Sequence, residues 1–324
     1  MENNGKLRTG VIGVGRMGQF HVNVYSELPE VQLVGVADIN RRACQAMVEK
    51  FRVDYFENFH ELLKQVDVIS IAVPTPLHYE VAKEALQNGV HVLVEKPISD
   101  SFEKAQELFE IAAQRGLVLH VGHVERFNGA VQELHKIANE PILIESRRMG
   151  PFAARMKDDG VVLDLMIHDI DILLNLVDSE VEKVNVIGRS VYSENEDVLC
   201  AQMQFASGCL ATITASRATQ NKVRTMSITC KNKYVHLDFA DQEIQVHSMA
   251  ATEHNLEKQE LRYKEVEQRE RIFIHREHPL KLELRHLIDC VLNRANRRVS
   301  VENELKSLKL ALEILEGYKS KATV

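Results

Sequence analysis

Short runs of apolar and β-branched residues alternate with longer amphipathic stretches over residues 7–123. This alternation is typical of βαβ units, in which parallel strands are joined by helices. The expected strands are Arg8–Ile12, Gln32–Ala37, Val66–Val73, Val90–Glu95 and Val118–Val121. The expected helices are Met17–Ser26, Arg41–Phe51, His60–Lys64, Tyr79–Asn88 and Ser101–Arg115, with Ser99 or Asp100 as the N-cap of the last. The pattern therefore predicts an α/β domain with a doubly wound parallel sheet.

From about residue 124 the pattern changes to a succession of strands separated by tight turns. Helix Gly129–Asn139, strand Ile142–Arg148 and helix Val162–Val177 come first. The strands that follow are Val181–Val191, Val198–Phe205, Cys209–Ser216, Arg224–Thr229, Tyr234–Asp238 and Glu243–His247. Consecutive strands on tight turns indicate antiparallel pairing, so the second domain is expected to be α+β with a large, open, mostly antiparallel sheet.

The end of the chain completes the predicted division into domains. Residues 253–278 are heavily charged and are expected to be irregular or edge structure. Leu280–Asn293 and Val301–Tyr318 are expected to be terminal helices. We therefore predict one domain over residues 1–123 and another over 124–324, with terminal helices that can pack back on the first. The length of 324 residues agrees with two domains of about 150 residues.

Composition and charge exclude several classes of protein. Hydrophobic residues make up 45% and charged residues 27% of the chain, which is ordinary for a globular protein. The net charge of −7 argues against nucleic acid or an anionic membrane as the main partner. We see neither a membrane-spanning apolar run nor a signal peptide. The five cysteines are scattered without a CxxC pair, so neither disulfides nor a cysteine zinc site is expected, and a cytoplasmic location is predicted.

A glycine-rich turn follows the first predicted strand. Residues 13–18 read GVGRMG, which fits GxGxxG, and a predicted helix follows. The first glycine allows the tight turn, the second lets a pyrophosphate approach the backbone, and the third lets helix and strand pack closely. Asp38 ends the next strand twenty residues after Gly18, where an acid binds ribose hydroxyls. The predicted cofactor contacts here are Gly13, Gly15, Arg16, Met17, Gly18 and Asp38.

The charge of Asp38 bears on which nicotinamide cofactor is bound. A carboxylate would repel the 2′-phosphate of NADP by about 1 to 4 kcal/mol at contact distance. NAD is therefore the expected cofactor and NADP is disfavoured, although Arg41 and Arg42 lie close enough in sequence to weaken the preference.

Two more segments stand at the carboxyl ends of predicted strands, where open α/β sheets bind ligands. The segment Pro74–His78 follows one strand, and Glu95-Lys96-Pro97 ends the next. Pro97 restricts Lys96 to extended backbone, although a lysine in such a place is more often an ordinary surface residue. The residues assigned to the cofactor from these segments are Pro74, Thr75, His78, Glu95 and Lys96.

The second domain supplies a cluster of acids around one histidine. Asp164 and His168 are four residues apart on a predicted helix and share one face, and Asp171 lies three residues further on. A capping or self-satisfied polar cluster is the plain alternative, and a zinc site is another. No second His or Cys pair of suitable spacing lies nearby, so no metal is predicted.

These motifs together resemble the Gfo/Idh/MocA family of oxidoreductases. GVIGVGRMG, Asp38, PTPLH, EKP, the pair Gly122-His123 and DLMIHDID occur in the family's order, and the segment from Pro279 resembles its C-terminal tail. The resemblance implies a Rossmann domain for NAD(P) and oxidation or reduction of a sugar or polyol carbinol. It also implies a second domain whose open sheet mediates assembly into a homodimer or homotetramer. One departure is residues 158–161, DDGV, where many members carry a run of glycines.

Carried onto this chain, the resemblance makes Lys96, Asp164 and His168 the catalytic group. Loss of hydride from a carbinol produces a carbonyl only if the hydroxyl proton also leaves, and an imidazole is a suitable base near neutral pH. His168 is thus expected to be the base. The Lys96 ammonium would stabilise negative charge on the same oxygen, and Asp164 would orient His168.

Three further segments, residues 122–128, 147–152 and 160–171, resemble the subgroup that acts on nucleotide-linked amino sugars. The small-molecule substrate implied is UDP-N-acetylglucosamine, oxidised at its 3-hydroxyl to the 3-keto sugar. The expected substrate contacts are His123, Arg126, Arg148, Arg155, Asp164 and His168. The arginines are included because their guanidinium groups suit diphosphate oxygens. Two alternatives stay open: a dehydrogenase of a free sugar or inositol, and a non-catalytic NAD-binding regulator on the same fold.

Overall fold

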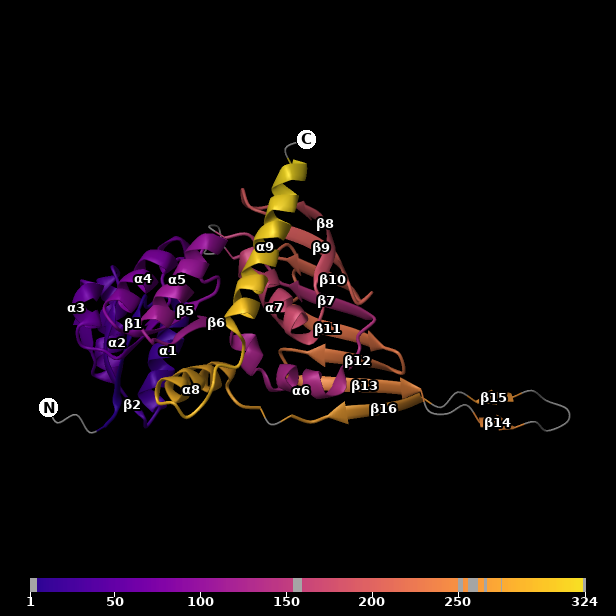
Figure 1. Cartoon of the computed structure of the whole chain (residues 1–324), viewed down its shortest axis with the longest axis horizontal. Helices are drawn as coiled ribbons and strands as arrows, with labels where there is room; N and C mark the ends of the chain where they lie inside the picture. The colour runs from indigo at the N-terminus through magenta and orange to yellow at the C-terminus, as the bar shows by residue number, and fades with distance from the viewer. Residues whose placement is uncertain are drawn as a thin grey trace. The chain divides into compact units, whose positions relative to one another are not determined.

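The computed structural model describes residues 5–153, 159–249, 253–255, 262–264, 267–274 and 276–322 (Figure 1). The chain divides into two compact units. The first holds Met1–Phe127 and His278–Lys309, and the second holds Asn128–Glu277 and Leu310–Val324. Among the described helices, none is both long and apolar enough to cross a lipid bilayer.

The first unit contains a sheet of six parallel strands in the order β3-β2-β1-β4-β5-β6. Its strands are β1 (Leu7–Ile12), β2 (Val31–Ala37), β3 (Asp54–Phe56), β4 (Val68–Ile71), β5 (His91–Glu95) and β6 (Leu119–Gly122). This order is the Rossmann order, and it confirms the predicted doubly wound sheet. The order reverses between β1 and β4, which is where such sheets bind ligands beyond the carboxyl ends of their strands.

The helices of the first unit agree with the amphipathic stretches of the sequence. They are α1 (Arg16–Glu27), α2 (Arg41–Phe51), α3 (Phe59–Leu63), α4 (His78–Gln87), α5 (Phe102–Gln114) and α8 (Pro279–Val291), with short 3₁₀ turns η1 (Thr75–Leu77) and η2 (Val124–Phe127). The expected cap of α5 was wrong. Ser101 accepts the Lys104 N–H at 3.2 Å, whereas Ser99 donates its hydroxyl to the Ser101 carbonyl at 2.6 Å.

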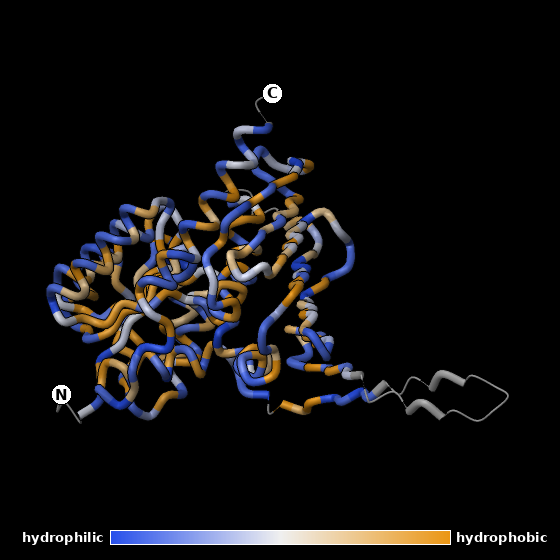
Figure 2. The backbone as a smooth tube through the Cα atoms, turned by 45° about the vertical axis from the view of Figure 1, so that its right-hand side comes forward, coloured by the Kyte–Doolittle hydropathy of each residue, from blue (hydrophilic) through white to orange (hydrophobic). Residues whose placement is uncertain are grey.

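The core of the first unit includes residues from the far end of the sequence. Leu280, Leu284 and Leu287 of α8 belong to the same buried cluster as Val22 and Tyr25 of α1. These leucines recur at helical spacing, so one face of α8 is apolar and must be buried. The first compact unit therefore includes His278–Lys309 as well as the chain up to Phe127. In Figure 2 the strands inside this unit are mainly orange, and its outer helices alternate between blue and orange.

The second unit contains an eight-stranded sheet in the order β16-β13-β12-β11-β7-β10-β9-β8. Its strands are β7 (Leu143–Met149), β8 (Val181–Arg189), β9 (Val198–Phe205), β10 (Leu210–Ser216), β11 (Val223–Cys230), β12 (Lys233–Asp238), β13 (Glu243–Met249) and β16 (Glu267–Ile272). Only the pair β7 and β10 is parallel among the pairs described, which confirms a large, mostly antiparallel sheet. The charged stretch 253–278 was expected to be irregular or edge structure, and it contains β16, which lies at the edge of this sheet. It also contains β14 (Glu253–Asn255), which pairs with β15 (Arg262–Lys264).

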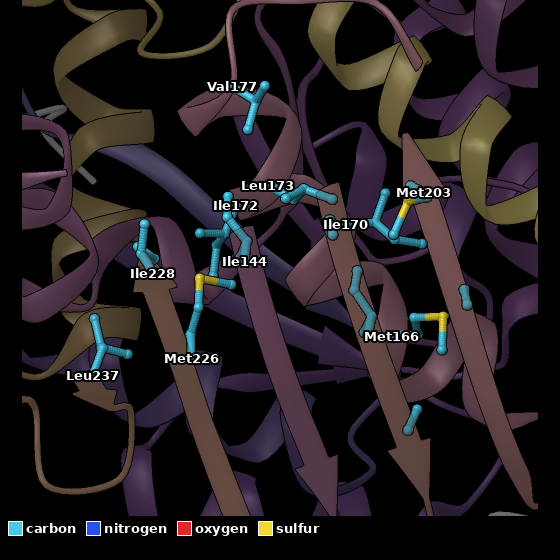
Figure 3. Close-up of a cluster of buried hydrophobic side chains, with 14 of the residues drawn as sticks. Ile144, Met166, Ile170, Ile172, Leu173, Val177, Met203, Met226, Ile228 and Leu237 are labelled. Atoms are coloured by element: carbon cyan, nitrogen blue, oxygen red, sulfur yellow. The ribbon is translucent and has the colours of Figure 1, made fainter. Parts of the chain in front are cut away.

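One face of this sheet packs against helices to form a second core. Figure 3 shows Ile144 of β7 and Met226 and Ile228 of β11 beside residues of α7 (Ile167–Leu176), including Ile172. The remaining helices of the unit are α6 (Gly129–Ile137), the π-helical turn η4 (Val162–Met166) and the latter part of α9 (Val301–Ala322). Side chains alternate along each strand, so the other face of the sheet has no part in this core.

Candidate functional site

The glycine turn of the first unit has the geometry that its spacing predicted. Gly13 has a φ of +88°, and a Cβ there would lie 2.5 Å from the Ala72 carbonyl oxygen. A Cβ on Gly18 would lie 1.8 Å from the Gly13 carbonyl oxygen. Gly15 is exposed, and nothing lies within 4 Å of the position its Cβ would take. The first and third glycines are therefore required by the packing, and the second leaves open space beside the turn.

This open space lies at the N-terminus of α1. Gly15 is the N-cap, so it supplies no side-chain acceptor to the first N–H groups of the helix, and the first turn contains no acid. Helix N-termini of this kind bind phosphate through N–H groups and the helix dipole. The side chain of Arg16 is exposed and Met17 is half-buried beside the same turn. The turn thus fits the pyrophosphate of a dinucleotide.

Asp38 joins the end of β2 to the glycine turn. Its carboxylate accepts the Val14 N–H at 2.7 Å and the Asn40 N–H at 2.7 Å. A carboxylate can accept more than two hydrogen bonds, so the oxygens can also accept ribose hydroxyls. The position and charge of Asp38 fit NAD, and they disfavour a 2′-phosphate.

The loops after β4 and β5 are tied together by His78. Its Nδ1 lies 2.7 Å from the Pro97 carbonyl oxygen, and its Nε2 lies 2.9 Å from the Val73 carbonyl oxygen. Lys96 is half-buried and precedes Pro97 through a cis peptide bond. Pro74 is exposed and Thr75 is half-buried at the start of η1. Both nitrogens of the buried His78 ring face the protein backbone, so the structure places this residue as a support of the Lys96 loop.

Glu95 lies at the end of β5 within the buried part of the unit. Its Oε1 is 2.8 Å from Nε2 of the fully buried His21, and a Cβ on Gly122 would be 3.1 Å from the carboxyl group. Glu283 of α8 is also buried, and burial followed by the charge of Glu95 raises the pKa of Glu283 well above its ordinary value. Glu95 and Lys96 were both assigned to the cofactor, but the Glu95 carboxylate faces these interior groups.

Arg126 and His123 both lie near Glu304, which the sequence analysis did not identify. Nη1 and Nη2 of Arg126 donate to the two carboxylate oxygens of Glu304 at 2.7 and 2.8 Å. Arg297 also donates to Glu304, at 3.0 Å, and Nε2 of His123 is 3.9 Å from it. Burial raises the pKa of Glu304, but the Arg126 charge and hydrogen bonds outweigh it and the pKa is lowered. The arginine fork expected to bind diphosphate therefore already holds a carboxylate.

In the second unit, Asp164 lies in the π-helical turn η4 and His168 lies in the first turn of α7. The sequence predicts one continuous helix, Val162–Val177, over the whole segment. π-helical turns are rare, occur mostly as single turns within α-helices, and are frequent at functional sites. Asp164 and His168 are both half-buried, whereas Asp171 is buried. The irregular turn thus contains Asp164, one of the three residues that the resemblance implies are catalytic.

Arg148 was expected to contact substrate, and the structure places it inside the second unit. Its side chain is 4% exposed, and Nε and Nη2 donate to the two oxygens of Asp169 at 2.8 and 2.9 Å. The guanidinium also lies over the Phe239 ring, 4.9 Å from its centroid. Asp169 of α7 therefore already accepts from Nε and Nη2 of this guanidinium group. Arg155 lies outside the described residues.

A histidine and cysteine cluster lies in the first unit. His120, His286 and Cys290 offer donor atoms within 4.8 Å of one another, and His286 Nε2 is 3.7 Å from Cys290 Sγ. Burial lowers the pKa of His120 to about 3, and the Arg297 charge acts in the same direction. Burial and then Arg298 lower the pKa of His286. The positive charges of Arg297 and Arg298 beside these imidazoles oppose a metal cation.

Comparison with known proteins agrees with this arrangement over nearly the whole chain. Residues 7–123 match the oxidoreductase family with an NAD-binding Rossmann fold, and residues 129–236 match the GFO/IDH/MocA C-terminal domain. The UDP-N-acetylglucosamine 3-dehydrogenase of Acidithiobacillus ferrooxidans is 36% identical over 246 residues, which cover 76% of this chain and 78% of that protein. A solved structure of that enzyme superposes with a TM-score of 0.88 at 30% identity, covering 97% of this chain and 98% of that one.

Inositol dehydrogenases are also among the similar proteins. The inositol 2-dehydrogenase of Rubrobacter xylanophilus is 31% identical over 193 residues, 56% of each chain. The scyllo-inositol dehydrogenase of Lactobacillus casei, solved with NAD(H) and scyllo-inositol, has the same fold, with a TM-score of 0.79, 20% identity and 98% of each chain covered. The first unit is an NAD-binding domain, as the glycine turn and Asp38 predicted. The chain therefore belongs to the Gfo/Idh/MocA family of oxidoreductases, as an NAD-dependent sugar dehydrogenase that acts on a CH–OH group.

Proposed function

We propose that this enzyme oxidises the 3-hydroxyl of UDP-N-acetylglucosamine to the 3-keto sugar, with NAD as the oxidant. The observation that carries the proposal is the 36% identity with the UDP-N-acetylglucosamine 3-dehydrogenase over 76% of this chain. Lys96, Asp164 and His168 are all present on this chain. The inositol 2-dehydrogenase is 31% identical over a smaller share of this chain, 56%, so the similarity supports the UDP-sugar more strongly than an inositol.

The proposed roles follow from the chemistry of a carbinol. The hydroxyl O–H bond breaks and its proton passes to His168, while the C–H bond breaks with its electron pair. The nicotinamide, when bound, accepts that hydride. The Lys96 ammonium stabilises the negative charge that develops on the oxygen. Asp164 holds the His168 imidazole in the orientation that leaves a nitrogen free to accept the proton.

The structure limits how the diphosphate can be recognised. Arg126 and Arg148 hold Glu304 and Asp169 with both ends of their guanidinium groups. Recognition through these two arginines would require those buried ion pairs to open, which is unfavourable because each would leave an unpaired buried carboxylate. We therefore propose that Arg126 and Arg148 support the fold around the substrate. His123, Arg155, Asp164 and His168 remain the proposed direct contacts.

The decisive experiment supplies the purified chain with NAD and one substrate at a time and follows NADH absorbance. UDP-N-acetylglucosamine should give NADH together with a product two mass units lighter than the substrate. Free N-acetylglucosamine should give none, because it lacks the nucleotide. NADH from free sugars but none from the UDP-sugar would overturn the proposal.

A second candidate is a free inositol as substrate. It is favoured by the 31% identity with the inositol 2-dehydrogenase and by the engagement of Arg126 and Arg148 within the protein. myo-Inositol and scyllo-inositol in the same assay discriminate the two candidates, since turnover of either with no signal from the UDP-sugar establishes the second.

We also propose assembly into a homodimer or homotetramer through the open sheet of the second unit. Ile187, Leu210 and Tyr234 are 71%, 50% and 39% exposed, and each neighbours a buried residue on its strand, so all three belong to the face opposite the core. Light scattering coupled to gel filtration should give twice or four times the 36.9 kDa chain mass. A mass of one chain would contradict this proposal.

A further inference from the structure

The N-terminus of the π-helical turn η4 is capped by Glu196, a residue from the distant loop before β9. The Val162 N–H donates to Glu196 Oε1 at 3.0 Å, and the Val161 N–H donates to the Glu196 backbone carbonyl at 3.0 Å. The N-cap residue of η4, Val161, supplies no side-chain acceptor. Glu196 therefore satisfies two successive N–H groups that a helix start otherwise leaves without acceptors. Its carboxyl group is also placed where the helix dipole favours negative charge.

The Glu196 carboxyl group occupies the space that a side chain at Gly160 would need. A Cβ at position 160 would lie 1.9 Å from Glu196 Oε1 and 2.2 Å from its Cδ. The Gly160 carbonyl in turn accepts the Asp164 N–H at 3.1 Å. One glycine thus contacts the capping carboxyl group on one side and the backbone of Asp164 on the other. Any side chain at this position must displace the Glu196 carboxyl group.

The capping loop is itself fixed by a buried ion pair. Arg217 Nε donates to Asp197 Oδ1 at 2.5 Å, and the two side chains are 1% and 0% exposed. Arg217 Nη1 donates to the Asp159 carbonyl at 2.6 Å, so the same guanidinium holds the segment that leads into Gly160. Asp197 Oδ2 also accepts the N–H groups of Val191 and Ser193, at 2.6 and 3.0 Å. Glu196 consequently projects from a rigid support.

We infer that Glu196 is a positioning residue, which holds η4 in its π-helical form through Gly160 and so fixes Asp164 relative to His168. The inference rests on the proposed catalytic roles of Asp164 and His168. The support is continuous: Arg217 and Asp197 fix the loop, Glu196 caps the turn, and Gly160 connects the cap to Asp164. Glu196 acts through the turn and has no part in the reaction itself.

Three variants of the full-length chain separate the cap from general stability. Glu196→Ala removes the acceptor for Val162. Glu196→Gln keeps an acceptor oxygen of the same reach, so it should rescue the function. Gly160→Ala leaves Glu196 in the sequence but expels its carboxyl group from the cap, and its backbone is outside the left-handed region where alanine is strained. The exposed Glu182→Ala in the same unit is the matched control.

Two readouts are measured on each variant and on the double variant Gly160→Ala with Glu196→Ala. The first is hydrogen exchange of the peptide containing Val161 and Val162, which does not depend on any substrate. We expect exchange about fivefold faster or more in both alanine variants, because a capping bond is worth about 1 kcal/mol. The second is steady-state oxidation of the substrate identified by the NADH assay. We expect kcat to fall about 10- to 100-fold with KM for NAD unchanged, since small misplacement of catalytic groups has effects of this size.

The double variant tests whether the two residues act as one unit. We expect it to be no worse than either single alanine variant, because each alone already removes the cap. Glu196→Gln and Glu182→Ala should resemble the wild type in both readouts. Unchanged exchange in Glu196→Ala, additive losses in the double variant, or accelerated exchange with unchanged kcat would each overturn the inference. If the wild type oxidises no sugar, the proposed function fails, and the exchange results alone decide whether Glu196 holds the turn.

Discussion

In the first unit, the loops around the glycine turn and Lys96 are held by hydrogen bonds from side chains to backbone atoms. His78 joins the loops after β4 and β5, and Asp38 joins the end of β2 to the glycine turn. Ser101 caps the helix that follows Lys96. Each of these ties connects residues that follow the carboxyl ends of parallel strands, where the doubly wound topology already brings the loops together.

In the second unit, Asp164 and His168 lie on a helix whose surroundings are fixed by buried charges. Glu196 caps the turn, and Asp197 pairs with Arg217 beneath the same loop. Asp169 of α7 pairs with the buried Arg148 of β7. These partners come from strands and loops far along the chain. Regular topology therefore positions the first set of residues, whereas the second set depends on a few buried ion pairs, each of which is costly to break.

The largest expected effects test whether both units carry chemistry. Lys96→Ala in the first unit and His168→Ala in the second should each lower kcat about 10²- to 10⁴-fold, as expected for loss of an acid–base or charge-stabilising group. The exposed His135→Ala in α6 is a control for His168 and should keep wild-type turnover. Steady-state NADH formation measures all three. Wild-type turnover by His168→Ala would show that the second unit does not supply the base.

The next effect tests the cost of breaking a buried ion pair in the second unit. Asp197→Ala leaves the Arg217 guanidinium buried without its carboxylate, so the free energy of unfolding should fall by about 3 to 5 kcal/mol. Glu61→Ala in the first unit removes an exposed pair with Lys64 and should cost about 0 to 1 kcal/mol. Urea unfolding followed by circular dichroism compares them. Equal losses in the two variants would contradict the expected difference between the buried and the exposed ion pair.

A pH-dependent effect is expected from Glu283, a buried acid of the first unit. Burial, and then the charge of Glu95, raise the pKa of Glu283, so the folded state holds a proton that the unfolded chain releases above pH 4.5. Stability should therefore decrease as pH rises through this range, by up to about 1.4 kcal/mol per pH unit, until the folded carboxyl group also ionises. Glu283→Gln should flatten that slope in urea unfolding measured at successive pH values. An identical slope in wild type and variant would contradict the assignment.

The smallest effect concerns a local tie in the first unit. Ser101→Ala removes the acceptor for the Lys104 N–H at the start of α5 and should lower the free energy of unfolding by about 1 kcal/mol. Asp100→Ala removes only an exposed pair with Lys104 and should cost less. Thermal unfolding of the two variants gives the order, and a larger loss for Asp100→Ala would restore the cap that the sequence suggested.

Much of the first unit could be predicted because its signals are local. GxGxxG, the acid twenty residues later and the EKP segment each lie within one turn or at one strand end. The strand β3 was missed because it has only three residues, too few for a periodic pattern. The cap of α5 was misplaced because three consecutive residues, Ser99, Asp100 and Ser101, all have side chains that can cap a helix, and only the backbone decides which one does.

The supports of the second unit could not be predicted in the same way. No particular residue type marks a π-helical turn in a sequence, and the apolar spacing of Val162–Val177 fits a regular α-helix equally well. Similarly, Arg148 and Asp169 both lie in predicted elements, but their spacing in the sequence does not indicate that they form an ion pair. A usable signal was present, because Asp169 and Asp171 stand among the isoleucines and leucines of α7. Acids in so apolar a helix face must have buried partners, although the sequence does not identify those partners.

Helix α8 and the start of α9 belong to the first unit, and the rest of α9 belongs to the second, so the two units are not separate stretches of sequence. The chain passes between the units after residues 127, 277 and 309, and α9 continues as one helix through the last of these points. A truncation after residue 277 would remove Leu280, Leu284 and Leu287 from the core around α1, leaving the NAD-binding unit incomplete. One cut in the gene therefore cannot release a folded cofactor domain. An exchange of the second unit between relatives must join the chain at two loops and also preserve the register of a single helix.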